Sequence, residues 1–108
     1  KDNFTIMKEE PFGPLVPILT FKTFDEVIER ANDNDLGLCS YLYTNSMDKA
    51  HIGSEKLESG CVAVNTGVVA IAEAPFGGIK QTGYGREGGS GAIKDYLNVK
   101  YTHMGLKI

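Results

Sequence analysis

Glycine is concentrated in one part of the chain, and this limits what that part can fold into. Seven of the 13 glycines lie between Gly77 and Gly91. Glycine adopts backbone conformations that other residues avoid, and it loses the most conformational freedom when it is fixed in a helix or strand. The density therefore predicts a long, shaped loop, and such loops in compact domains are usually functional or disordered.

Part of this loop has the spacing of a dinucleotide-binding turn. The stretch TGYGREGG, residues 82–89, contains G-x-G-x-x-G. That turn needs a buried strand before the first glycine, a helix after the third, and an acidic residue about 20 positions later. Here FGGIKQ precedes the pattern, and about 20 residues beyond it the sequence reaches Ile108. We therefore expect a structural glycine loop that packs closely against other elements.

Three segments before the loop have the length and composition of strands: residues 15–21, 38–44 and 61–66. Pro17 places the first of them at a strand start or a sheet edge. The second is apolar or aromatic on both faces, which is typical of a strand covered on both sides.

Two helices are predicted between these strands. Thr23 and Glu26 form a capping-box pair, followed by apolar residues on one helical face. Ser46 caps a second helix that runs to about Leu57. The resulting order, βαβαβ, predicts an α/β fold with a parallel sheet. After the glycine-rich loop we expect a short helix in GAIKDYLN and a last strand from Val99 to about residue 106.

The composition excludes several function classes. Hydrophobic residues make up 42% and charged residues 23%, and the net charge of -3 comes without a long run of one sign. This argues against binding to nucleic acid or to a membrane surface. The first residues, KDNFTIMKEE, have no initiator Met and no signal-peptide profile, so the chain looks like part of a longer one.

Cysteine and histidine are scarce. Cys39 and Cys61 lie in apolar runs and fit no zinc motif, so we expect structural thiols in a reducing, cytoplasmic compartment. The two histidines are far apart in the sequence, which argues against a metal site.

Three motifs together carry a family resemblance. EEPFGPLVPILTF, VNTG and APFGGIKQTGYGREGG occur in an order and spacing that resemble the C-terminal part of the aldehyde dehydrogenase superfamily. The sequence looks most similar to succinate-semialdehyde dehydrogenases and their relatives that act on dicarboxylic semialdehydes. The resemblance implies that residues 1–97 are the C-terminal part of a catalytic domain and residues 98–108 an oligomerisation strand. It implies a homo-oligomer, a dimer or tetramer, assembled through that strand.

The resemblance also implies a reaction. In this family a cysteine thiolate attacks the aldehyde, hydride passes to NAD or NADP, and a Glu-activated water hydrolyses the thioester. The nucleophile and the base lie upstream of the matched segment in the family. No catalytic residue is therefore assigned in this chain, neither Cys39 nor Cys61 matches the nucleophile, and the chain alone is predicted to be inactive.

Four residues receive binding roles from the resemblance. Glu10 matches the acid that holds the nicotinamide ribose, and Phe12 the aromatic residue beside the nicotinamide. Phe76 matches an aromatic residue of the aldehyde tunnel, and Ala70 a variable specificity position in the substrate-entrance loop. Succinate-semialdehyde enzymes often have serine where this chain has Ala70. Succinate semialdehyde, a longer oxo-acid such as 2,5-dioxopentanoate and a less polar aldehyde therefore all remain candidate substrates.

A second hypothesis is a non-catalytic α/β interaction or oligomerisation module. It is supported by the absence of any nucleophile–base–orienter set within the sequence. The gene sequence upstream would discriminate the two hypotheses.

Overall fold

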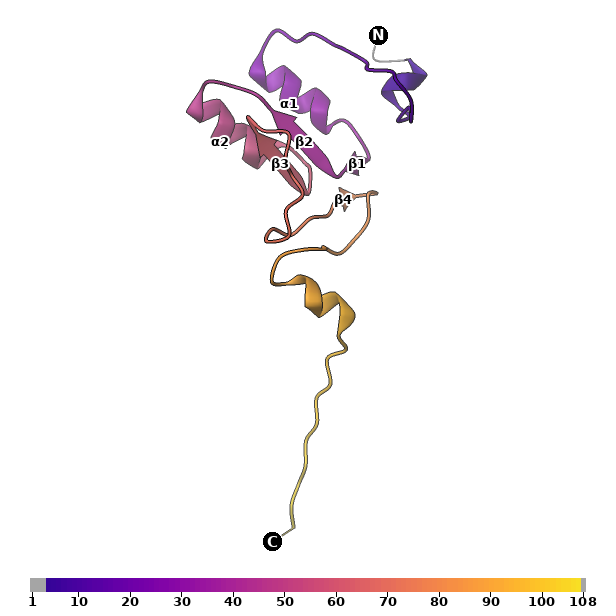
Figure 1. Ribbon diagram of the computed structural model, residues 1–108, viewed down its shortest axis with the longest axis vertical. Coiled ribbons are helices and arrows are strands. Elements are labelled where there is room, and N and C mark those ends of the chain that lie inside the picture. Colours follow the sequence, from indigo (N-terminus) through magenta and orange to yellow (C-terminus); the bar gives the residue numbers. More distant parts are fainter. Residues whose placement is uncertain (1–3, 108) are drawn as a thin grey trace.

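The computed structural model describes residues 4–107 and combines a small α/β unit with an extended C-terminal segment (Figure 1). In chain order the elements are η1 (Thr5–Met7), α1 (Phe24–Asn32), β1 (Leu36–Gly37), β2 (Cys39–Leu42), α2 (Met47–Lys56), β3 (Cys61–Val64), β4 (Ile79–Lys80) and η2 (Ala92–Tyr96). Both η elements are 3-10 helices. Figure 1 places α1, α2, β2 and β3 together, with the glycine-rich segment and η2 beyond them.

The start of α1 confirms the predicted capping box. The Thr23 side chain accepts a hydrogen bond from the Glu26 backbone N–H at 3.2 Å. The Glu26 carboxylate accepts from the Lys22 N–H at 2.9 Å, one residue earlier than in the usual box. This backbone N–H, followed by that of Thr23 and the nearby Arg30, lowers the pKa of Glu26 below its ordinary value.

One βαβ unit is present, and it confirms the predicted parallel pairing. β2 and β3 are parallel neighbours with Cys39 opposite Cys61 and Leu42 opposite Val64, and α2 connects them. Ser46 caps α2 as predicted, since its hydroxyl accepts from the Lys49 N–H. A Cβ added at Gly53 of α2 would lie 2.5 Å from Leu42 Cδ2, so this glycine allows α2 to pack closely on β2.

The first predicted strand is wrong for this chain, and the last predicted strand has no pairing partner among the described residues. Residues 15–21 form no ladder, and Val16 and Ile18 are 81% and 82% exposed. Residues 99–106 run away from the rest of the molecule without pairing (Figure 1). A strand needs a neighbour that shares its backbone hydrogen bonds, and no described segment lies in that position. The βαβαβ prediction is thus reduced to the single unit β2-α2-β3.

The glycine-rich segment is a loop as predicted, with one short pairing that the sequence did not reveal. β4 pairs antiparallel with β1, with Ile79 opposite Gly37. Thr82 reinforces this pair, because its hydroxyl accepts from the Gly37 N–H at 2.8 Å. The predicted short helix in GAIKDYLN is the 3-10 helix η2.

The chain buries little apolar surface. Among the described residues Ile28 and Ala63 are the buried hydrophobic side chains, whereas many large apolar side chains are exposed. Neither α1 nor α2, nor any other helix between residues 4 and 107, has the length and apolar character to cross a membrane.

Candidate functional site

The loop of residues 68–76 is fastened to the glycine-rich segment by backbone hydrogen bonds. Phe76 and Glu87 exchange a reciprocal pair, with N···O distances of 2.7 and 2.9 Å. Gly89 donates to the Ala72 carbonyl at 2.8 Å. A Cβ at Gly88 would lie 2.6 Å from the Ala74 carbonyl oxygen, and its φ of +69° also favours glycine. The two segments therefore hold each other in one conformation.

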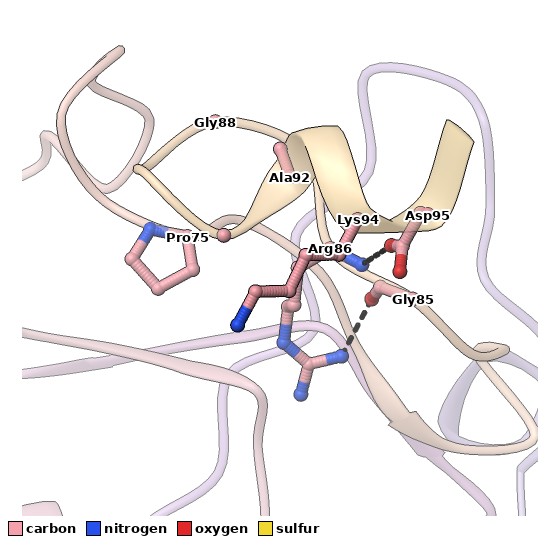
Figure 2. Close-up of a pocket in the computed structure, with 8 residues that line it drawn as sticks. Pro75, Gly85, Arg86, Gly88, Ala92, Lys94 and Asp95 are labelled. Atoms are coloured by element: carbon pink, nitrogen blue, oxygen red, sulfur yellow. Dashed lines mark hydrogen bonds between the residues drawn. The ribbon is translucent and has the colours of Figure 1, made fainter. Parts of the chain in front are cut away.

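Arg86 joins three parts of this region (Figure 2). Its backbone N–H donates to the Asp95 carboxylate of η2 at 3.2 Å. Its guanidinium donates to the Gly85 and Gly78 carbonyls at 2.7 and 2.8 Å. These bonds connect η2, the glycine-rich segment and the start of β4 around an open pocket of about 360 Å³ that also includes Pro75.

The geometry supports the rejection of a dinucleotide-binding turn. A phosphate-binding turn presents backbone N–H groups to the anion. Here the N–H groups of Arg86, Glu87 and Gly89 donate to other parts of the chain. The acceptor for Arg86 is itself a carboxylate, which would repel a phosphate. The G-x-G-x-x-G pattern therefore belongs to a structural loop whose backbone groups bond to neighbouring segments of the chain.

The four site residues predicted from the resemblance lie in two separate places. Glu10 and Phe12 follow η1, and both are exposed, Phe12 by 97%. Ala70 is exposed and Phe76 half-buried, both in the loop after β3. The pocket beside the glycine-rich segment is lined by Phe76 but not by Glu10, Phe12 or Ala70. The described chain does not bring the two pairs into one pocket.

Asn65 is a positioning residue that sequence reasoning missed. It follows β3 directly and has a φ of +56°, a conformation that asparagine tolerates better than most residues. Its side chain accepts from the Thr44 N–H and donates to the Thr44 carbonyl, both at 2.9 Å. Asn65 thus ties the end of β2 to the start of the loop that carries Ala70. An asparagine directly after a β-branched strand was the available signal.

Lys80 is a second residue whose role the sequence did not reveal, and it hydrogen-bonds to the C-terminal end of α1. Its ammonium donates to the carbonyls of Asn32 and Asn34, both at 2.9 Å. It also pairs with Glu58 at 2.6 Å. The carbonyls at a helix end lack intrahelical partners, so a cation there satisfies them and opposes the negative end of the helix dipole. The described residues contain no group of three or more His, Cys, Asp or Glu side chains suited to a metal ion.

Comparison with known proteins identifies the class. The aldehyde dehydrogenase family model matches residues 1–102. The chain therefore belongs to the aldehyde dehydrogenase family, as the sequence motifs predict.

Individual relatives are similar along nearly the whole chain. The chain is 46% identical over 104 residues to the succinate-semialdehyde dehydrogenase [NADP(+)] of Escherichia coli K12, covering 96% of this chain and 22% of that protein. It is 46% identical over 103 residues to a glutarate-semialdehyde dehydrogenase of Pseudomonas aeruginosa, covering 95% and 21%. The NAD+ complex of an aldehyde dehydrogenase from Bacillus cereus superposes with a TM-score of 0.88 at 46% identity, covering 93% and 20%. The chain spans about a fifth of the length of the relatives it matches.

Proposed function

We propose that this chain is the C-terminal segment of an NAD(P)-dependent aldehyde dehydrogenase that oxidises a semialdehyde, such as succinate semialdehyde, to the carboxylic acid. The observation that carries the proposal is the 46% identity to a succinate-semialdehyde dehydrogenase over 96% of the chain. The exposed apolar surface supports it, because a chain that buries only Ile28 and Ala63 among its described hydrophobic residues needs further protein to cover the rest.

Glu10 and Phe12 are proposed to bind the cofactor. A carboxylate accepts two hydrogen bonds from a ribose diol, and an aromatic ring packs against the nicotinamide. Both side chains are exposed and so are available to a ligand held by the rest of the enzyme. One relative is named for NADP(+) and one similar structure contains NAD+, so either cofactor fits the proposal. When bound, the cofactor would accept the hydride.

Ala70 and Phe76 are proposed to contact the aldehyde. Phe76 is fixed by its paired hydrogen bonds with Glu87, and Asn65 anchors the start of the same loop. The relatives described above are named for semialdehydes of four- and five-carbon dicarboxylic acids. A substrate with a distal carboxylate is therefore the class we propose. The methyl group of Ala70 would offer it no hydrogen bond.

The substrate class can be tested on the full-length enzyme with succinate semialdehyde, glutarate semialdehyde and butanal. We expect kcat/KM to be about 10- to 100-fold higher for the semialdehydes than for butanal, because a bound carboxylate adds charged hydrogen bonds. Ala70→Ser should raise kcat/KM for succinate semialdehyde, whereas the matched Ala72→Ser should not. Equal activity with butanal would contradict the proposed substrate class.

The position of the segment has a separate test. The transcript upstream should encode the family's catalytic cysteine and glutamate, and the 108-residue chain alone should produce no NAD(P)H. An unrelated upstream domain, or a stop codon, would favour the non-catalytic interaction module.

Residues 98–108 are proposed to pair with a sheet edge of a partner subunit in a dimer or tetramer; the structure describes residues 98–107 of this segment, and Ile108 lies outside the described residues. Support comes from their extended, unpaired backbone and from Val99 and Tyr101, which are 102% and 85% exposed.

A cytoplasmic location is also proposed, since both cysteines are free thiols. Cell fractionation would test it.

A further inference from the structure

The two cysteines of the chain occupy directly opposed positions in the parallel ladder. Cys39 at the start of β2 is the register partner of Cys61 at the start of β3. Opposed residues on neighbouring strands project to the same face of the sheet, and the strands are about 4.8 Å apart. Two residues separated by 22 positions in the sequence therefore place their thiols side by side.

Both thiols are free and partly shielded from solvent. Both cysteines are half-buried and neither forms a disulfide. The Cys61 thiol donates to the Gly77 carbonyl, with a sulfur–oxygen distance of 3.7 Å. Burial raises the pKa of Cys39 above its ordinary value, and the adjacent Cys61 raises it further. The Cys39 thiol is therefore kept in its protonated form beside the Cys61 thiol at neutral pH.

We propose that Cys39 and Cys61 form a two-thiol site that binds trivalent arsenic compounds with a single organic substituent. Sulfur is the ligand that such soft elements prefer. In the reaction both As–O bonds of an organic arsonous acid, R–As(OH)₂, break and two As–S bonds form. The two thiol protons leave with the two hydroxyl groups as water. Arsenic remains trivalent, so no oxidant or reductant is needed.

The same features disfavour other uses of the pair. Oxidation by a peroxide begins with a thiolate, and the raised pKa of Cys39 reduces its thiolate fraction at neutral pH. Structural zinc needs four ligands, and the described residues contain no cluster of even three suitable side chains. Condensation with a trivalent arsenical requires two adjacent thiols and no prior ionisation, which is the arrangement that the β2–β3 register provides.

The test uses phenylarsine oxide with the full-length protein. Intact mass under non-reducing conditions should show one more bound phenylarsenic group in the wild type than in Cys39→Ala or Cys61→Ala, and both variants should lose the same one. That group should resist an excess of monothiol and be removed by 2,3-dimercaptopropanol. Equal numbers in all three proteins, or a loss in only one variant, would overturn the proposal.

A second measurement does not depend on the variants folding. Trypsin cleavage places Cys39 in residues 31–49 and Cys61 in residues 57–80, with one cysteine in each peptide. In the treated wild type these two peptides should be joined through one phenylarsenic group. Recovery of both peptides unlinked, at an arsenical concentration that saturates the protein, would also overturn the proposal.

Discussion

Replacing Gly60 with alanine tests whether the glycine-rich segment packs directly on the parallel pair. Gly60 precedes β3, and its N–H donates to the Gly37 carbonyl at 3.0 Å. An added Cβ would overlap the Gly77 carbonyl oxygen and lie 2.8 Å from Gly77 C and 2.9 Å from Gly78 Cα. All three are backbone atoms, so no side-chain rotation can relieve the overlap.

Overpacking of this kind usually costs about 1–3 kcal/mol. Because only backbone movement can make room, we expect the upper part of that range, roughly 2–3 kcal/mol. The movement would also disturb the 2.8 Å bond from Arg86 to the Gly78 carbonyl, which holds the loop in place. A loss of this size corresponds to roughly a 30- to 150-fold change in the opening equilibrium.

Amide hydrogen exchange of the full-length enzyme measures this change locally. The Cys61 N–H donates to the Leu38 carbonyl at 2.9 Å, and its protection should fall by the same 30- to 150-fold. Gly91→Ala is the matched control, since Gly91 has a φ of -85° and nothing within 4 Å of an added Cβ. Equal protection of Cys61 in Gly60→Ala and Gly91→Ala would refute the packing argument.

Three further perturbations follow from single contacts. Thr23→Ala should destabilise α1 by about 1 kcal/mol through loss of its N-terminal cap, whereas Thr23→Ser should keep the cap. Faster amide exchange across α1 in Thr23→Ala would measure this loss. Equal exchange rates in the two variants would contradict it. Lys80→Met should lower the free energy of unfolding by about 1–2 kcal/mol, because it removes two hydrogen bonds to carbonyls and the ion pair with Glu58. The urea midpoint should fall accordingly. An unchanged midpoint would count against a role of Lys80 at the end of α1. Truncation after Asn98 should lower the oligomeric state in light scattering, whereas an unchanged mass per particle would remove the pairing role of residues 98–107.

Local interactions could be predicted from the sequence, and distant pairings could not. The caps of α1 and α2 were predictable because Thr23 and Ser46 act on residues three positions away. The pairing of Gly37 with Ile79 joins two-residue strands far apart in the sequence, and such short segments carry no periodicity. Residues 15–21 have a strand-like composition, but composition does not show whether a neighbouring strand is present to share their backbone hydrogen bonds.

In the candidate site, too, some features could be predicted from the sequence and others depend on contacts made by folding. The density of glycine predicted a structural loop that packs against other elements, and the hydrogen bonds of Arg86 and Gly89 confirm this packing. The roles of Asn65 and Lys80 depend on partners brought close by folding, Thr44 and the end of α1. The roles of Glu10 and Phe12 come from the family resemblance and stay predictions.

The most direct test of the central proposal is the cofactor affinity of the full-length enzyme carrying Glu10→Gln, compared with the matched neighbour Glu9→Gln. Loss of one charged acceptor for the ribose should weaken binding by about 1.5–3 kcal/mol, so the KM for NAD or NADP should rise roughly 10- to 150-fold in Glu10→Gln alone. The KM in Glu9→Gln should stay at the wild-type value, and both variants should keep the wild-type thermal midpoint. The same KM in Glu10→Gln and the wild type, with the fold intact, would contradict the assignment of this segment to cofactor binding.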